Sequence, residues 1–304
     1  MSRHSLAAAF AALALIVAAC GTNPGPSPTA VASPFASGHN VLPRIVSSEL
    51  GVGPNRVLVS FLDSTGTKPA GSPDRTVSVA FRGPGGQTVP TQPTTFIWAI
   101  KGVVGVYVLH ATFPVAGAWT ADFTTSAPGS AEATIPFGFD VKDRTGVLAP
   151  GDPAPAVATP TIAGAGGDVA KVSTDPNPVP RLYQTSEADA IAAKKPFVLI
   201  FATPKFCQTS TCGPTLEKLK PVAAAHPGLT FINVEPYVLQ DVQGQLQPVT
   251  DANGFQPAPA TLAFKLISEP YVFVIGADGK ISSSFELVFS PEEIDAAIKA
   301  VTPA

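Results

Sequence analysis

The sequence predicts a multidomain protein in which an all-β sandwich precedes an α/β domain. Residues 38–142 carry short β-rich runs separated by Gly and Pro turns, the pattern of an antiparallel sandwich. Residues 181–304 instead alternate helical and strand patterns. The chain has 304 residues and 33 prolines, many of them in residues 143–180. We therefore expect two folded domains joined by this Pro/Ala-rich linker.

Composition narrows the functional classes. Apolar residues make up 45% of the chain and charged residues 13%, which argues against a charge-driven disordered protein. The formal net charge of -3 argues against a nucleic-acid-binding surface. Zinc-ligand spacing, a Gly-rich phosphate loop and a Ser/His/Asp arrangement are not found, so we expect no cofactor and no metal.

The N-terminus predicts export. A basic start and an apolar run of about fourteen residues indicate a signal peptide over residues 1–19, since the run is short for a membrane span. Small residues lead into Cys20 and Gly21, and this segment resembles a bacterial lipobox, which implies that Cys20 is lipidated. The alternative is an ordinary signal peptide. Residues 20–37 are rich in Pro and Ser and read as a tether. We expect anchoring to the extracytoplasmic face of the cell membrane, where disulfides persist.

The first block gives five strand predictions, each bounded by turn residues: 56–62, 76–81, 103–113, 118–123 and 135–141. The stretch with Tyr107, Gly117 and Trp119 resembles small bacterial immunoglobulin-like modules. We expect Tyr107 and Trp119 to be core residues. His110 lies in a strand and is expected to be a packed or surface histidine rather than a metal ligand.

The second block gives helices and strands in alternation. Strands are predicted at the continuous apolar runs, and helices at segments with capping residues or an N-terminal proline. Ser290 and Glu293 form a capping box around Pro291. The expected order is a helix from 186, a strand at 197–201, a helix from 214, a strand at 229–234, an insert at 236–261, strands at 271–275 and 281–287, and a helix from 290.

Two cysteines carry the chemistry. Cys207 follows the first buried strand and Cys212 stands just before Pro214. This strand-to-helix junction resembles the thioredoxin-like superfamily, which implies a dithiol site for disulfide exchange. A helix N-terminus favours the thiolate, and the thiolate is the nucleophile. Lys205 would strengthen that effect if its side chain turned inward.

A second segment supports the resemblance. Residues 268–273 look like the family's cis-proline segment, which implies that Pro270 and the backbone of Glu269 shape the place where a partner's chain docks. The cysteine spacing departs from the family, because four residues instead of two separate the pair. Five positions on a helix rotate the chain by about 140°, so Cys207 must lie in a loop before the helix for the sulfurs to meet.

Several alternatives remain open. Cys207 is favoured as nucleophile and Cys212 as resolver, but Cys212 begins a Cys-Gly-Pro sequence and could take the first role. The usual buried acid is replaced near Ile200 by an apolar residue. The pair could form a static disulfide in a scaffold or binding lipoprotein. Copper is a further option for soft ligands, although His226 suits a helix C-terminus better than a metal site.

The sequence thus predicts an exported, membrane-anchored thiol–disulfide oxidoreductase. Its site residues would be Cys207, Cys212 and Pro270, with Cys20 as the lipidation site. Its partners would be thiols or disulfides of exported proteins, met through a mixed disulfide.

Overall fold

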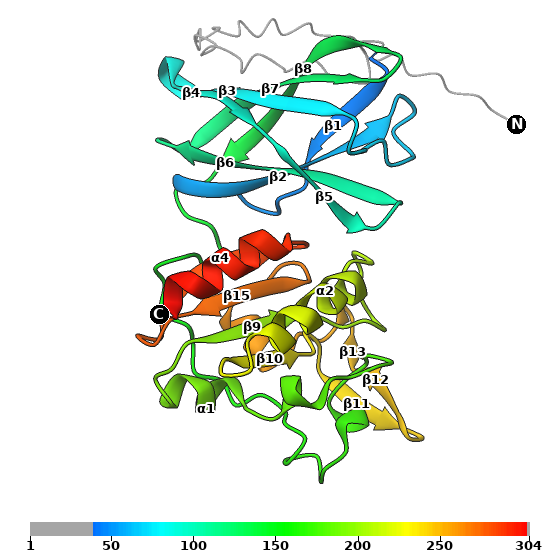
Figure 1. Ribbon diagram of the computed structural model, residues 1–304, viewed down its shortest axis with the longest axis vertical. Helices are drawn as coiled ribbons and strands as arrows, with labels where there is room; N and C mark the ends of the chain where they lie inside the picture. The colour runs from blue at the N-terminus through cyan, green and yellow to red at the C-terminus, as the bar shows by residue number, and fades with distance from the viewer. Residues whose placement is uncertain (1–38, 303–304) are drawn as a thin grey trace, which may run out of the picture. The chain divides into compact units, whose positions relative to one another are not determined.

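A computed structural model describes residues 39–302 (Figure 1). The predicted signal peptide at 1–19, Cys20 and the tether at 20–37 lie outside the described residues. Within 39–302, no helix is both long enough and apolar enough to cross a membrane.

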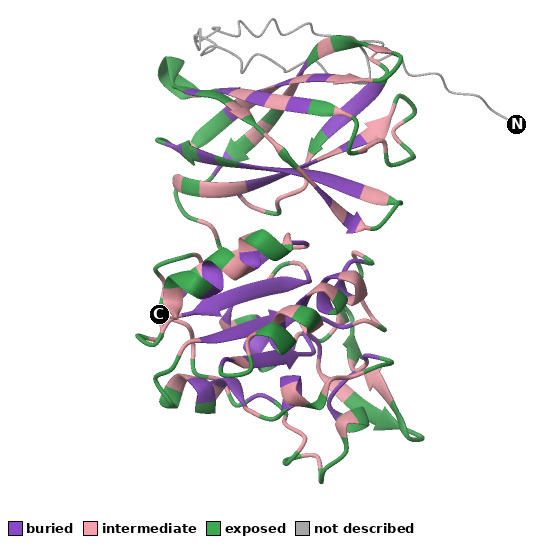
Figure 2. Ribbon diagram, viewed as in Figure 1, coloured by how far each residue is buried: buried purple, intermediate pink, exposed green. Residues whose placement is uncertain are grey.

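Residues 41–141 form two four-stranded antiparallel sheets. Their strand orders are β1-β2-β6-β5 and β4-β3-β7-β8. The strands are β1 (Val41–Ile45), β2 (Gly53–Asp63), β3 (Thr76–Arg82), β4 (Thr88–Pro93), β5 (Thr95–Ile100), β6 (Val104–Phe113), β7 (Gly117–Ala127) and β8 (Ser130–Val141). Buried positions alternate with others along β3 and β7, as expected when one face of a sheet covers a core (Figure 2).

One apolar core joins the two sheets of this β-sandwich. It contains Tyr107 and Trp119, which confirms their prediction as core residues. The Tyr107 hydroxyl is satisfied by the backbone of Ser72: it donates to the carbonyl at 2.8 Å and accepts from the amide at 3.0 Å. His110 is exposed on β6, consistent with a surface histidine.

The C-terminal part is built on a third four-stranded sheet, of order β10-β9-β15-β16. Two small hairpins, β11-β12 and β13-β14, occupy the predicted insert. The elements are α1 (Glu187–Ala192), β9 (Phe197–Phe201), α2 (Cys212–Ala225), β10 (Thr230–Val234), β11 (Leu239–Val242), β12 (Gln245–Pro248), β13 (Thr250–Asp251), β14 (Gly254–Phe255), α3 (Pro259–Ala263), β15 (Tyr271–Ile275), β16 (Ile281–Glu286) and α4 (Pro291–Val301).

Strands β9 and β15 are buried along their whole length because both faces of the third sheet are covered. Alternate residues of β9 enter different cores: Val198 and Ile200 pack with residues of α2 and α4, whereas Phe197 and Phe201 pack with Phe264 and β15. Continuous apolar runs are the expected sequence for such strands.

The assignment of the C-terminal part to an α/β thioredoxin-like fold is wrong. Residues 39–302 are predominantly β, with sixteen strands in five sheets and only four α-helices. In the third sheet only β9 and β10 pair in parallel, and both other pairings are antiparallel. Antiparallel neighbours need no helical crossover, and only the parallel pair β9 and β10 is joined through a helix, α2, so the sheet lacks the repeated strand–helix–strand units of an α/β fold. For the N-terminal part, the structure shows a pair of packed β-sheets and does not establish the immunoglobulin-like resemblance beyond that.

Residues 143–180 differ from the expected linker. They hold little regular structure, but their apolar side chains pack into the two C-terminal cores, with Val147 in one and Val172 in the other. The many prolines of this segment disfavour helices and strands, but they do not prevent its apolar side chains from being buried.

Candidate functional site

Cys207 and Cys212 form a disulfide at the start of α2. Their Cα atoms lie 5.9 Å apart, within the ordinary range for a disulfide. Strand β9 ends at Phe201 and α2 begins at Cys212, so Cys207 lies in the intervening loop, as its spacing required. Without that loop the two sulfurs would point to different sides of a helix.

The two sulfurs have different environments. Cys212 is fully buried in the core beneath α2, whereas Cys207 is half-buried and packs at the edge of that core. The backbone N–H of Cys212 donates to Cys207 Sγ at 3.2 Å. This amide belongs to the first turn of a fourteen-residue helix, where backbone donors and the helix dipole stabilise negative charge. Cys207 is therefore the more accessible residue of the pair, and its sulfur is the one that this amide contacts.

Glu269 is a buried acid beside the disulfide, with only 6% of its surface exposed. Its Oε1 accepts the backbone N–H of Gln208 at 2.7 Å, which fixes the carboxylate against the cysteine loop. The Gln208 side chain in turn donates to the hydroxyl of Tyr237 at 3.1 Å. Burial, and next the negative charge of Glu269, raise the pKa of Tyr237, so this hydroxyl stays protonated.

The segment around Pro270 lies against the same loop. The Thr209 hydroxyl donates to the carbonyl of Glu269 at 2.7 Å, and the Thr209 oxygen lies 3.4 Å from Cys207 Sγ. The peptide bond between Glu269 and Pro270 is cis. The structure thus brings Cys207 and Cys212 close to Glu269, the residue that precedes the predicted Pro270.

Lys205 does not reinforce the thiolate in the way considered from the sequence. Its side chain is exposed, and its Nζ lies 5.4 Å from the centre of the Phe206 ring. The Phe206 ring meets Phe255 of the insert edge-on, and Phe255 meets Tyr237 in the same way. The insert therefore supplies an aromatic wall next to the cysteine loop.

Sequence reasoning missed the side chains of Glu269 and Tyr237. Glu269 was considered only for its backbone, although an acid directly before Pro270 and a wholly apolar strand is an available signal. Together with Cys207 and Cys212, it gives three ligand atoms within 4.8 Å of one another, a set that could hold a metal ion. His226 lies elsewhere, at the C-terminus of α2, where Nε2 is 3.1 Å from Asp295 Oδ1.

A second buried acid, Glu235, follows β10 and lines a cavity of about 190 Å³. Its Oε1 accepts the backbone N–H of Thr174 at 2.6 Å, while Oε2 has no hydrogen-bond partner among the described residues. Asn233 lines the same cavity and its Oδ1 is also unpartnered there. Burial raises the pKa of Glu235 to about 7, against hydrogen bonds from Thr203 and Thr174 that lower it.

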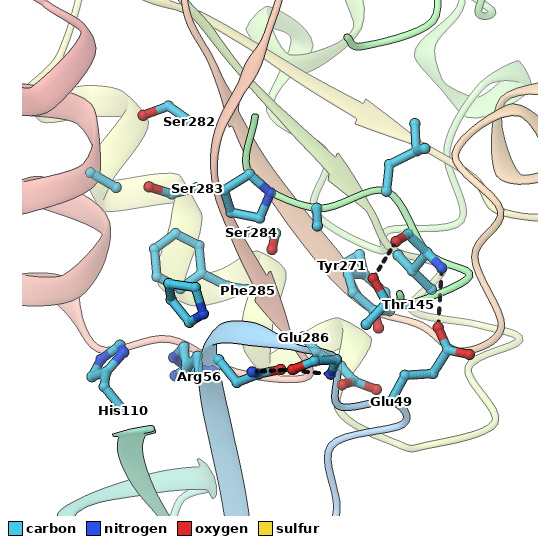
Figure 3. Close-up of a pocket in the computed structure, with 18 of the residues that line it drawn as sticks. Glu49, Arg56, His110, Thr145, Tyr271, Ser282, Ser283, Ser284, Phe285 and Glu286 are labelled. Atoms are coloured by element: carbon cyan, nitrogen blue, oxygen red, sulfur yellow. Dashed lines mark hydrogen bonds between the residues drawn. The ribbon is translucent and has the colours of Figure 1, made fainter. Parts of the chain in front are cut away.

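A cavity of about 730 Å³ is lined by residues of both sequence halves (Figure 3). Several of its charged groups are paired. Arg56 Nε and Glu293 Oε1 lie 2.8 Å apart, and although burial opposes the effect, Arg56 lowers the pKa of Glu293. Glu286 accepts from the Ser48 amide at 3.0 Å and from the Ser268 hydroxyl at 3.0 Å. Such pairing explains these charges structurally, so the cysteine site remains the better candidate.

Comparisons with known proteins give no family for this chain. No protein-family model matches it, and no curated protein does so either. Among solved structures, a DUF4426 family protein from Pseudomonas aeruginosa PAO1 is similar over 34% of this chain and 91% of its own length, at 14% identity and a TM-score of 0.26. A likeness of this extent assigns neither fold nor function to the chain.

Proposed function

We propose that the chain is an extracytoplasmic, membrane-anchored protein that exchanges disulfides with exported proteins through Cys207 and Cys212. The observation that carries the proposal is the asymmetry of the pair: Cys207 is half-buried and accepts an N–H from the start of α2, while Cys212 is fully buried. An accessible, stabilised sulfur next to a protected one is the arrangement that exchange requires.

The exchange proceeds through a mixed disulfide. A partner's thiolate attacks Cys207 Sγ, the partner–Cys207 bond forms, and the Cys207–Cys212 bond breaks. Cys212 leaves as a thiolate and takes a proton from solvent. A second thiolate of the partner then attacks the partner's sulfur in the mixed disulfide. A disulfide forms within the partner, the bond to Cys207 breaks, and Cys207 leaves as a thiolate. The partner is oxidised by two electrons, and the pair is reduced by two. The reverse sequence oxidises the pair and reduces the partner.

Trapping the mixed disulfide tests this assignment. In Cys212→Ser the resolving sulfur is missing, so adducts between Cys207 and partner proteins should accumulate on non-reducing gels of the cell envelope. The matched control is Cys207→Ser, in which the remaining sulfur is the buried one and adducts should be few. If both variants fold and neither forms adducts, the disulfide is structural and the chain is a binding lipoprotein.

The reduction potential gives an independent test. Differential alkylation followed by mass spectrometry, across a series of glutathione and dithiothreitol buffers, measures the reduced fraction of the pair. Structural disulfides lie below about -300 mV. The proposal requires a value above this limit, so a lower potential contradicts exchange in the cell envelope.

The anchor is part of the same proposal and rests on the sequence around Cys20. Metabolic labelling with a radioactive fatty acid should mark the wild-type chain, and Cys20→Ser should abolish the label. A Cys20→Ser chain that keeps its label would contradict lipidation at this position. A wild-type chain that is never labelled would leave the ordinary signal peptide as the explanation.

A further inference from the structure

The disulfide and Glu269 together have the composition of a metal site. Two sulfurs and one carboxylate oxygen lie within 4.8 Å of one another. The loop after β9, the first residue of α2 and the segment before β15 supply this set, which is therefore held by three different parts of the C-terminal fold. We propose that the reduced form of the pair binds a divalent d¹⁰ cation of the zinc type through Cys207, Cys212 and Glu269.

The chemistry of the donors selects the cation. Two thiolates and one carboxylate suit borderline-soft cations such as Zn²⁺ and disfavour Mg²⁺ and Ca²⁺, which take oxygen ligands. Three protein ligands leave one position of a tetrahedron for water. Cys207 is the half-buried member of the set, so the open position and the path of entry lie on its side.

Backbone amides already contact two of the three ligands in the disulfide form. The Cys212 amide donates to Cys207 Sγ at 3.2 Å, and such an amide stabilises a metal-bound thiolate. The Gln208 amide donates to Oε1 of Glu269 at 2.7 Å, which orients the carboxylate. These contacts are the outer-shell interactions that a metal site uses to fix its ligands. They also give a reason for burying an acid beside two sulfurs.

Binding and oxidation exclude each other. A dithiol reductant first delivers two electrons and two protons, which converts the disulfide to two thiols. The cation then displaces both thiol protons and forms two metal–sulfur bonds, so two protons are released for each ion bound. Metal occupancy would therefore protect the pair from oxidation and prevent exchange. This inference rests on the proposed function only in requiring that the pair can be reduced.

Cobalt binding is the test, because Co²⁺ reports its ligands optically. The full chain is reduced with a dithiol under anaerobic conditions, desalted, and its free thiols are counted. It is then titrated with Co²⁺, and Zn²⁺ is added to displace the cobalt. We expect a thiolate-to-cobalt charge-transfer band together with the d–d absorption of tetrahedral cobalt, both removed by Zn²⁺. Reduced chains with both thiols free but no such bands would overturn the metal site and leave the exchange proposal intact. Chains whose thiols never form would overturn both.

Two further measurements isolate Glu269. Glu269→Gln keeps the size of the side chain and should weaken zinc binding by at least about 100-fold, because loss of an outer-shell partner alone costs about 10–100-fold and Glu269 is a direct ligand. Glu292→Gln, at an exposed acid of α4, is the matched control and should leave affinity unchanged. X-ray absorption of the zinc-loaded wild-type chain needs no variant to fold, and it should show two sulfur and two oxygen neighbours. Equal affinity in Glu269→Gln, or four sulfur neighbours, would overturn the three-ligand site.

Discussion

The β-sandwich and the C-terminal half fill their interiors differently. The core of the sandwich is apolar and aromatic: Phe113 meets Trp119 edge-on at 5.1 Å, and Phe61 meets Tyr107 at 5.5 Å. In the sandwich, the side chain of Glu49 is largely buried but forms an ion pair with Lys142. The C-terminal half buries four acids, which are Asp175, Glu187, Glu235 and Glu269.

This difference separates a core made of apolar packing from one that also contains buried ionisable groups. Burying a carboxylate costs free energy unless it is paired, and Glu187 and Glu235 each keep one oxygen without a hydrogen bond among the described residues. Burial raises the pKa of both groups to about 7. Perturbed groups of this kind gather at functional sites. The comparison therefore favours the C-terminal half for the proposed chemistry, whereas the sandwich is stabilised by apolar packing.

The largest effect should come from opening the aromatic core of the sandwich. Trp119→Ala removes a fully buried ring and should lower the free energy of unfolding by about 3–5 kcal/mol, measured by chemical denaturation. Val103→Ala, at a side chain that is 60% exposed, should change it by no more than about 0.5 kcal/mol. A loss below about 1 kcal/mol in Trp119→Ala would show that the sandwich does not depend on this core.

The stability of the C-terminal half should depend on pH through the buried acid Glu235. The folded chain keeps a proton on Glu235 up to a pKa of about 7, whereas the unfolded chain loses it near the ordinary value of 4.5. The unfolded state thus binds fewer protons in this window, and stability falls as pH rises from about 4.5 to 7. Glu235→Gln removes the ionisation. The loss of unfolding free energy between pH 5 and pH 8 should therefore be about 1–3 kcal/mol smaller in the variant than in the wild type.

Denaturation of wild type and variant at pH 5, 6, 7 and 8 measures this difference. Glu132→Gln, at an exposed acid of the sandwich, is the matched control and should leave the pH dependence unchanged. An identical pH profile in Glu235→Gln and wild type would show that Glu235 is not held as a protonated acid, and would weaken the contrast between the halves.

The smallest effect concerns a helix cap. The Ser290 hydroxyl accepts the Glu293 amide at 3.2 Å, and the Glu293 carboxylate accepts the Ser290 amide at 2.9 Å. Ser290→Ala should cost about 1 kcal/mol of unfolding free energy in a denaturant titration. Ser282→Ala, at an exposed position of β16, provides the control and should be neutral. Equal stability of the two variants would show that α4 is held by packing alone.

Local patterns predicted individual elements well, whereas the fold class was not predicted. The apolar run at 197–201 and the capping box at Ser290 both encode an element within a few residues, and both elements occur there. The pairing direction of the strands depends on contacts between distant segments, such as β9 with β15. Local sequence patterns do not reveal these contacts. Residues 236–257 gave no periodic signal and nevertheless form two hairpins.

The candidate site was predictable in its cysteines and not in its surroundings. The loop between Phe201 and Cys212 follows from spacing and helix geometry, because only a loop allows the sulfurs to meet. Glu269 stands 57 positions after Cys212 in the sequence, and only folding brings its carboxylate to the sulfurs. The same is true of Tyr237, whose contact with Gln208 joins the insert to the loop.

Both tryptophans of the chain lie in the sandwich, Trp98 in β5 and Trp119 in β7, while Tyr183, Tyr237 and Tyr271 lie in the C-terminal half. Indole emission therefore monitors the melting of the sandwich selectively, without any introduced label. Far-ultraviolet circular dichroism monitors both halves. Superimposable transitions from the two optical signals would indicate that the halves unfold as one cooperative unit, and separated transitions would identify two.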